Sequence, residues 1–251
     1  MYKRQSEGIA QLPDCVLCWA PVEDYPLPRP RPAAAPVVFG SFNNAMKLSP
    51  RTIALWAQVL HAVPGSRLQL KAPSLQDGGV QARFIERFAA HGIAAERLIL
   101  HGPSGLAAMM QAYGEVDLAL DPTPYNGGTT TLQALWMGVP VVSLAGGNFV
   151  SRMGASFLST LGHPEWVASD EAGYVATAVR LAADCRDWRA RRAGLRARMA
   201  ASPLCDIATW VAQLEALYDR MWAVYCSGSG QRLLAAATSN QPLRAEDDSG
   251  T

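Results

Sequence analysis

The stretch VDLALDPTPYNGGTTTLQALWMGVPVV, residues 116–142, decides the fold of this chain. Residues 116–121 are nearly all apolar, which is typical of a central strand in a parallel sheet. A turn, two glycines and three threonines follow, then an apolar helix and a further strand over 139–144. A strand, a helix and a second strand in this order predict a parallel βαβ unit.

The same alternation continues on both sides of this unit. Further strands are expected at 37–41, 67–71 and 97–101. Ser49 and Pro50 are typical of a helix start, and Asp206 precedes a final helix with a wide apolar surface. Other helices are expected near 80–91, 105–113, 151–161, 171–183 and 185–200. The pattern predicts an α/β fold with a parallel sheet covered by helices on both faces.

Composition and charge exclude several classes of protein. Apolar residues make up 49% of the 251 residues and charged residues 17%, which indicates a globular chain. The net charge of +1 gives no reason to expect nucleic acid or an anionic membrane as the partner. No apolar run reaches the roughly 18 residues of a membrane span, and the first residues do not resemble a signal peptide. Five scattered cysteines do not form a disulfide framework, so we expect a cytoplasmic protein.

Three other segments allow two readings each. Cys15 and Cys18 form a C-x-x-C, but no second pair completes a zinc site, so a packed extended segment is favoured over metal or redox chemistry. Residues 26–36 contain five prolines and predict an extended connector rather than a ligand for a partner domain. Residues 185–199 contain six arginines, and a solvated helix face is favoured over an RNA-binding surface.

The residues after the central strand have the features of an anion site. Glycine brings bare backbone close to a ligand, and the first N–H groups of a helix favour an anion. Hydroxyl groups add further donors at the same place. Caps of this kind also occur without any ligand, so the pattern is not specific by itself. The residues concerned are Asn126, Gly127, Gly128, Thr129 and Thr130, with Gln133 on the same helical face.

A second loop is expected beside the first. The strand at 37–41 is followed by Asn43, Asn44 and Lys47, and the carboxyl ends of parallel strands meet at one edge of the sheet. A lysine there could neutralise a diphosphate, although a lone lysine is more often a surface charge. The P-loop motif and the G-x-G-x-x-G motif are absent, which argues against an NTPase or a dinucleotide dehydrogenase. The two loops together predict a nucleotide-diphosphate site.

Several of these motifs occur together in one known family. The segments FGSFNNAMKLSP, AYGEVDLALDPTPYNGGTTTLQALWMGVPVV and SRMGASFLSTLG resemble the catalytic C-terminal lobe of the O-linked N-acetylglucosamine transferase family, which includes a SPINDLY-like branch. The resemblance covers roughly residues 8–226. It implies a GT-B architecture with a Rossmann-like lobe that binds the nucleotide sugar.

The resemblance also implies an activity. Members transfer a sugar with inversion from a nucleotide sugar to a Ser or Thr hydroxyl, without a required metal or other cofactor. UDP-N-acetylglucosamine is the expected donor, and the protein acceptor is expected to bind an N-terminal lobe and tetratricopeptide repeats. A SPINDLY-like transferase that uses GDP-fucose is one alternative. A non-catalytic nucleotide-sugar-binding or scaffold fragment is another.

By position, the resemblance assigns roles to the two loops. Asn44 and Lys47 match the loop that meets the diphosphate, and Lys47 would stabilise the leaving group. The matched phosphate-binding helix start is Gly128, Thr129 and Thr130. Three positions depart from the family pattern. Gln133 replaces a carboxylate that reaches the ribose, Met109 stands where a histidine is expected, and Leu106 stands where a charged residue or a histidine is common.

The resemblance finally predicts how the chain is divided. Residues 1–36 would be the end of an N-terminal lobe and its linker, and 37–205 the nucleotide-sugar-binding domain. The helix over 206–226 would pack toward the other lobe, and 227–251 would be a disordered tail. We therefore expect Trp210, Leu217 and Trp222 to form an exposed apolar patch that promotes self-association.

Overall fold

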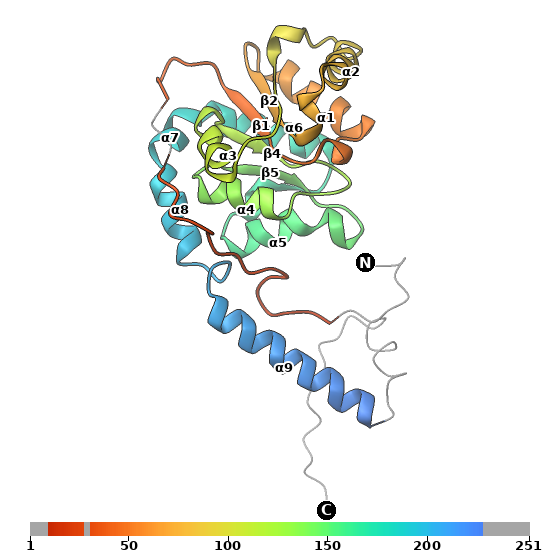
Figure 1. The fold of residues 1–251 in the computed structure, drawn as a ribbon, viewed down its shortest axis with the longest axis vertical. Coiled ribbons are helices and arrows are strands. Elements are labelled where there is room, and N and C mark those ends of the chain that lie inside the picture. The colour runs from red at the N-terminus through yellow and green to blue at the C-terminus, as the bar shows by residue number, and fades with distance from the viewer. Residues whose placement is uncertain (1–9, 28–30, 228–251) are drawn as a thin grey trace, which may run out of the picture.

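The computed structural model describes residues 10–27 and 31–227. Within this part, six strands form one parallel sheet with the order β3-β2-β1-β4-β5-β6 (Figure 1). This is the strand order of the Rossmann fold, so the predicted fold class is confirmed. The strands are β1 (Val38–Ser41), β2 (Arg67–Lys71), β3 (Leu98–His101), β4 (Leu118–Leu120), β5 (Val141–Leu144) and β6 (Val167–Ala168).

Helices cover both faces of the sheet. One face carries α1 (Pro50–Ala62), α2 (Gly78–Ala89) and α6 (Glu171–Ala183). The other carries α4 (Thr129–Trp136), α5 (Met153–Thr160) and α8 (Arg192–Ala200), and Figure 1 shows α4 and α5 below the sheet. The remaining α-helices of the described part are α3 (Leu106–Ala112), α7 (Cys185–Ala190) and α9 (Ile207–Cys226). Short 3₁₀ turns are η1 (Ala45–Lys47), η2 (Pro73–Gln76), η3 (Ala95–Arg97), η4 (Tyr113–Glu115), η5 (Phe149–Ser151) and η6 (Pro164–Trp166).

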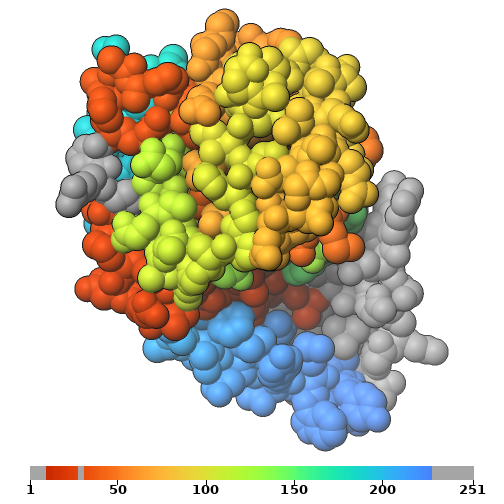
Figure 2. All heavy atoms as spheres, turned by 45° about the horizontal axis from the view of Figure 1, so that its top comes forward, coloured from red at the N-terminus to blue at the C-terminus, as the bar shows by residue number. Residues whose placement is uncertain are grey.

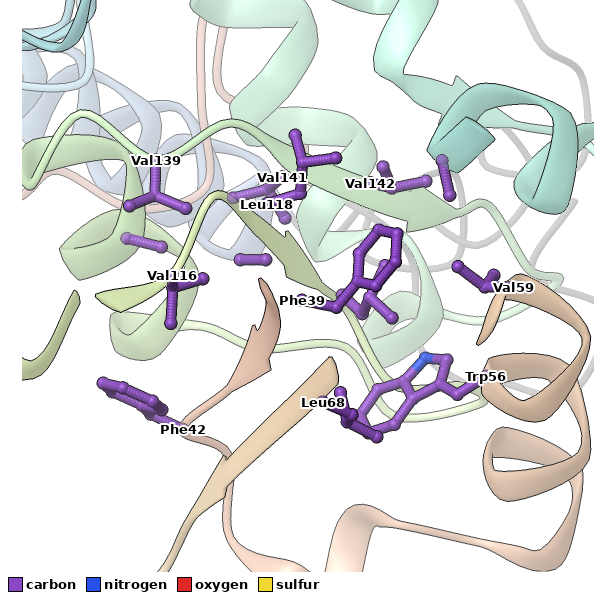
Figure 3. Packing of buried hydrophobic residues seen from close by; sticks show 14 of the residues in the cluster. Phe39, Phe42, Trp56, Val59, Leu68, Val116, Leu118, Val139, Val141 and Val142 are labelled. Atoms are coloured by element: carbon purple, nitrogen blue, oxygen red, sulfur yellow. The ribbon is translucent and has the colours of Figure 1, made fainter. Parts of the chain in front are cut away.

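The caps and the core follow from local sequence. The side chains of Ser49 and Asp206 accept hydrogen bonds from the first turns of α1 and α9, as predicted for these two helix starts. Phe39 of β1 and Trp56 of α1 belong to the same buried cluster (Figure 3). The Trp56 indole N–H donates to the Tyr174 hydroxyl at 3.1 Å, which satisfies its polar atom inside the core and joins α1 to α6.

Two element predictions were wrong. The structure adds β6, which has only two residues and therefore no detectable alternation. The helix expected over 185–200 is divided at Arg191 into α7 and α8. Neither proline nor a glycine pair stands at the division, so the sequence carries no signal for it.

The amino-terminal edge of the sheet is closed by a buried ion cluster. The Asp117 carboxylate accepts hydrogen bonds from Arg189 at 2.7 and 2.8 Å, from the Val38 N–H at 2.9 Å, and from Arg31. Arg189 also donates to four backbone carbonyls, those of Pro32, Ala33, Ala35 and Pro36. This cluster, Arg31–Asp117–Arg189, ties the proline-rich segment to β4 and α7.

The cluster corrects two predictions. The described end of the proline-rich segment is not simply extended, because the Ala35 N–H closes a turn onto the Pro32 carbonyl. Residues 28–30 lie outside the described part. The arginine-rich stretch is not only a solvated face, since Arg189 and Arg192 are buried and Arg192 donates to the carbonyls of Tyr113 and Val116. Arginines that serve as internal donors cannot be told from surface arginines by composition.

Helix α9 projects away from the sheet domain (Figure 1). None of its residues is buried in the described structure. Its first turn contacts the N-terminal segment, because the Trp210 indole donates to the Cys15 carbonyl. Just before α9, the Trp19 N–H donates to the Leu204 carbonyl. In Figure 2 this segment (red) lies between the sheet domain and α9 (blue). No helix among the described residues is long and apolar enough to cross a membrane.

The predicted apolar patch on α9 is confirmed in part. Trp222 is 66% exposed, whereas Trp210 and Leu217 are partly buried. The apolar side chains that are exposed on this helix are Ile207, Val211, Tyr218, Met221, Trp222 and Tyr225. Of the predicted tail, residues 228–251 lie outside the described part.

Candidate functional site

The candidate site lies where β1 and β4 meet. The chain leaves β1 toward α1 on one face and leaves β4 toward α4 on the other, so the two loops diverge at the carboxyl edge of the sheet. In parallel α/β sheets ligands bind in the crevice at this point. The loop after β1 carries Asn43, Asn44 and Lys47, and the loop after β4 leads through Asp121 to the start of α4. The structure therefore brings the two predicted loops together.

Lys47 connects these loops directly. Its ammonium group donates to the Asn126 carbonyl at 2.9 Å and lies 4.1 Å from the centre of the Tyr125 ring. Partial burial lowers the pKa of Lys47, and the nearby Asp121 carboxylate opposes that shift. An ammonium group has three N–H donors. One is used within the protein, so the others can face a ligand.

Asp121 organises the turn before α4. Its buried carboxylate accepts from the Gly127 N–H at 2.6 Å, from the Ser143 hydroxyl at 2.7 Å and from the Thr131 hydroxyl at 3.4 Å. Burial raises the pKa of Asp121 from 3.8 to about 6, and these donors and Lys47 limit the rise. Glycine fits this position without strain, whereas a Cβ atom at residue 127 would lie 2.3 Å from the Thr131 hydroxyl oxygen and force a neighbour to move.

This arrangement corrects the role expected of Gly127. Its N–H points to Asp121 instead of outward, so it is not available to an anion. The first turn of a helix leaves its N–H groups without intrahelical partners. Within the described structure, no partner is assigned to the N–H groups of Gly128, Thr129 and Thr130. These three amides are the donors that remain at the start of α4.

The threonine and asparagine side chains at the site differ in accessibility. Thr129 is exposed, whereas the Thr130 hydroxyl donates to the Asn43 side chain at 2.9 Å and so joins the two loops. Asn44 is exposed, and its side-chain oxygen caps η1 by accepting from the Met46 N–H at 3.0 Å. Asn44 thus lies at the predicted place while its oxygen supports the loop that holds Lys47.

Asn126 and Gln133 are buried. The Asn126 side chain donates to the Pro122 carbonyl at 2.9 Å and accepts from the Gly154 N–H at 3.4 Å, so it stabilises the turn. Its backbone carbonyl is the atom that meets Lys47. Gln133 lies on α4 with 9% of its surface exposed. It is not among the residues that line the crevice, and a contact of Gln133 with a ribose stays a prediction.

The crevice is narrow and has a mixed lining. Phe42 and Tyr113 stack with their ring centres 4.3 Å apart, and the Tyr113 hydroxyl donates to the Thr130 carbonyl at 3.0 Å. Met109, at the expected histidine position, packs against the hydrophobic core. The lining residues include Ser41, Phe42, Asn43, Tyr113, Asp121 and Thr130.

Sequence reasoning missed the most important acidic residue of the site. The sequence alone indicates Asp121 only as the last residue of a strand. The available signal was a carboxylate directly after an apolar central strand and before a Gly-Gly turn. Tyr125, which stacks on Lys47, was missed as well and carries no comparable signal. Among the described residues, no three His, Cys, Asp or Glu side chains come together as metal ligands do.

Comparisons with known proteins identify the family of the chain. The profile of glycosyl transferase family 41 matches residues 14–214. The chain is 36% identical to a probable UDP-N-acetylglucosamine–peptide N-acetylglucosaminyltransferase SPINDLY of Arabidopsis thaliana, over 98% of this chain and 28% of the relative. The corresponding protein of Petunia hybrida is 39% identical over 90% of this chain and 25% of the relative. The chain thus spans about a quarter of the length of these relatives.

Solved structures show the same relationship. A mutant of the O-GlcNAc transferase of Thermobaculum terrenum superposes with a TM-score of 0.78 at 34% identity, over 88% of this chain and 42% of that chain. A glycosyltransferase of Rickettsia africae shares the fold alone, with a TM-score of 0.51 at 12% identity. The family profile covers most of the chain and the relatives exceed 30% identity. The chain belongs to glycosyl transferase family 41.

Proposed function

We propose that this chain is the donor-binding lobe of an inverting protein O-glycosyltransferase that transfers N-acetylglucosamine from UDP-N-acetylglucosamine to Ser or Thr side chains. The choice of donor is supported by the relatives, whose names specify UDP-N-acetylglucosamine and a peptide acceptor. Because the chain spans only part of those proteins, acceptor binding belongs to the rest of the enzyme in this proposal. A cytoplasmic location is supported by five free cysteines.

One observation carries the proposal. The ammonium group of Lys47 donates to the carbonyl of Asn126, two residues before the open amides of Gly128–Thr130, so the cation and the amides meet at the turn that leads into α4. A half-buried cation beside a helix N-terminus is complementary to a diphosphate, because both present positive charge at one place. In this proposal Asn44 and Gln133 are peripheral to the diphosphate, and Thr129 and Thr130 contact it.

The same groups would also promote the reaction. Negative charge develops on the departing diphosphate as the glycosidic bond breaks. Groups that are fixed in place before the reaction stabilise that charge more in the transition state than in the ground state. Lys47 is held by Asn126 and Tyr125, so its ammonium needs little reorganisation. In this proposal the leaving group is stabilised by Lys47 and the α4 amides, without a metal ion.

Substitution of Lys47 tests the catalytic role. In an enzyme that joins this chain to the remaining lobe, Lys47→Ala is expected to lower turnover about 10²-fold or more, with a smaller loss of donor affinity. Lys71→Ala is the matched control, because Lys71 is also at the carboxyl edge of the sheet and donates to the Gly102 carbonyl at 3.0 Å. A change of affinity alone in Lys47→Ala would make Lys47 a binding residue and refute its catalytic role.

Calorimetric titration of the chain tests the donor. UDP and UDP-N-acetylglucosamine are expected to bind more tightly than GDP. Preferential binding of GDP would overturn the choice of donor in favour of a fucosyl donor. Absence of any nucleotide binding by the folded chain would overturn the donor-binding role.

We also propose that α9 contacts the N-terminal lobe of the complete enzyme. The support is its exposed apolar surface and the fact that the chain spans 42% of the Thermobaculum structure. The isolated chain is then expected to self-associate at high concentration, and Trp222→Ser is expected to reduce this. A monodisperse monomer by light scattering would contradict the proposal.

A further inference from the structure

Asp121 has the one carboxylate among the described residues that line the crevice. Three neighbouring groups donate hydrogen bonds to its carboxylate, and Gly154 of α5 packs closely against it. β5 contributes the Ser143 hydroxyl, α4 the Thr131 hydroxyl, and the turn the Gly127 N–H. An anionic ligand at the start of α4 would therefore bind close to a buried carboxylate.

Two titratable groups face Asp121 from the packed elements. Lys47 comes from the loop after β1 and stabilises the ionised carboxylate. Tyr174 comes from α6, and its hydroxyl donates to the Asp121 backbone carbonyl at 3.1 Å. Burial raises the pKa of Tyr174 well above 10, so this tyrosine stays neutral at physiological pH. Asp121 is thus the carboxylic acid of this cluster, and Lys47 is its cationic partner.

The hydrogen bonds of Asp121 define what it does for the turn. The carboxylate withdraws the Gly127 N–H from the crevice, so the following amides of Gly128–Thr130 form the exposed edge. A carboxylate, a neutral carboxyl group and an amide can each accept from Gly127, because each keeps one carbonyl-type oxygen. An alanine side chain cannot. The position of the turn therefore depends on the side-chain oxygen that accepts from the Gly127 N–H, whereas the charge at the site depends on whether the Asp121 carboxyl group is ionised.

We propose that Asp121 is a positioning residue of the donor site, which holds the anion-binding turn and takes up a proton when the nucleotide sugar binds. This inference rests on the proposed donor-binding function. A diphosphate beside Asp121 disfavours the ionised carboxylate, because like charges in one buried site repel each other. The positive charge of Lys47 weakens this repulsion, but it is shared between the diphosphate and the Asp121 carboxylate.

The repulsion between the diphosphate and Asp121 couples donor binding to the protonation of Asp121. Ligand binding raises the pKa of Asp121 above its value of about 6 in the free protein. The complex then holds more protons than the free protein between pH 6 and 7, so donor affinity falls as pH rises through that window. A rise of about one pKa unit corresponds to an affinity about tenfold lower at pH 8 than at pH 5.

Calorimetry of the full chain with UDP-N-acetylglucosamine tests the proposal. This donor has no phosphate group that titrates near pH 6, so proton uptake reports on the protein. Titrations at pH 6.5 in buffers of different ionisation enthalpy are expected to show uptake of about half a proton for a shift of about one unit. Asp121→Asn is expected to bind at least as tightly as the native chain at pH 7.5 and to show no uptake. Asp121→Ala is expected to bind at least about tenfold more weakly, because the turn loses its acceptor.

The controls separate the possible outcomes. Asp77→Asn removes an exposed aspartate that caps α2 and does not line the crevice, and its proton uptake is expected to match the native value. Lys47 is present in every variant, so loss of uptake in Asp121→Asn alone assigns the proton to Asp121. If Asp121→Ala fails to fold, proton uptake is still compared between the native chain and Asp121→Asn, and this comparison tests the inference. Native binding without uptake, or uptake retained in Asp121→Asn, overturns the inference, whereas absence of native binding overturns the donor-binding function.

Discussion

Asp117 and Asp121 stand directly before and directly after strand β4, and both are buried. Asp117 is surrounded by two arginines and a backbone N–H, so its charge is compensated within the protein. Asp121 accepts from two hydroxyls and one N–H, and no arginine contacts it in the described structure. One end of the strand is arranged for stability, and the other keeps an incompletely compensated charge where a ligand is proposed to bind. Such local conflicts are expected at functional or strained sites.

The largest effect is expected from removing Asp117. Asp117→Ala leaves Arg31 and Arg189 without their anion in a buried place, which is expected to lower the free energy of unfolding by about 3–5 kcal/mol. Urea unfolding monitored by circular dichroism measures this. Asp187→Ala is the control, because the Asp187–Arg191 pair is exposed and contributes little. A similar small loss in both variants would mean that the cluster does not stabilise the sheet.

Replacing Asp121 by Asn is expected to raise the free energy of unfolding at neutral pH, in contrast to the loss expected for Asp117→Ala. The pKa of this carboxyl group is about 6 in the folded chain and near 3.8 when unfolded. The folded state therefore holds the proton more tightly, and stability falls as pH rises from about 4 to about 6, by on the order of 3 kcal/mol in total. The asparagine side chain in Asp121→Asn cannot ionise, so the stability of this variant is not expected to fall over this pH range.

The stability curves of the two proteins should then diverge with pH. Unfolding free energies are expected to be similar at pH 4 and higher for Asp121→Asn at pH 7. Parallel curves over this range would show that Asp121 is as well compensated as Asp117, and the contrast between the two ends of β4 would disappear.

A smaller effect is expected from crowding the turn that Asp121 holds. A Cβ atom on Gly127 would lie 2.3 Å from the Thr131 hydroxyl oxygen and 3.1 Å from an Asp121 carboxylate oxygen. Gly127→Ala is expected to cost about 1–3 kcal/mol of stability through overpacking and to weaken nucleotide binding. Gly128→Ala is the matched control, since a Cβ atom there meets nothing within 4 Å. Equal melting temperatures for both variants would contradict the role given to the turn.

The smallest effect is expected at Thr130. Its hydroxyl donates to Asn43 across the two loops, and a single neutral hydrogen bond of this kind contributes about 1 kcal/mol. Thr130→Ala is expected to lower donor affinity only several-fold, because the amides of α4 remain. In a double-mutant cycle, Asn43→Ala should add little to Thr130→Ala. Full additivity would show that the two side chains act independently.

Much of the fold could be predicted because the sheet repeats one local pattern. The apolar strand over 116–121 and the caps at Ser49 and Asp206 are local signals, and they led to the right elements. Strand β6 was missed because two residues cannot show a period, and its pairing with β5 depends on tertiary contacts. The division of the sequence into domains stays a prediction.

The site could be predicted only at the level of its loops. Spacing placed Lys47 near the start of α4, since parallel strands bring their carboxyl ends together. Which N–H groups face outward could not be predicted, because the orientation of Gly127 depends on Asp121 six residues earlier. The inward orientation of the Asn126 side chain could not be predicted either, because it depends on hydrogen bonds with Pro122 and Gly154. Hydrogen bonds that a turn makes with its own strand leave no distinct sequence pattern.

The ion cluster at the amino-terminal edge has a consequence for the order of folding. Arg189 joins Asp117 across 72 residues and Pro32 across 157 residues of sequence. Closing such long loops is entropically costly before other contacts hold their ends together. These bonds are therefore expected to form after the folding transition state, so that Asp117→Ala mainly accelerates unfolding and leaves the folding rate nearly unchanged. Stopped-flow kinetics would show this as a shift of the unfolding limb alone, and the cluster would then set the lifetime of the folded chain.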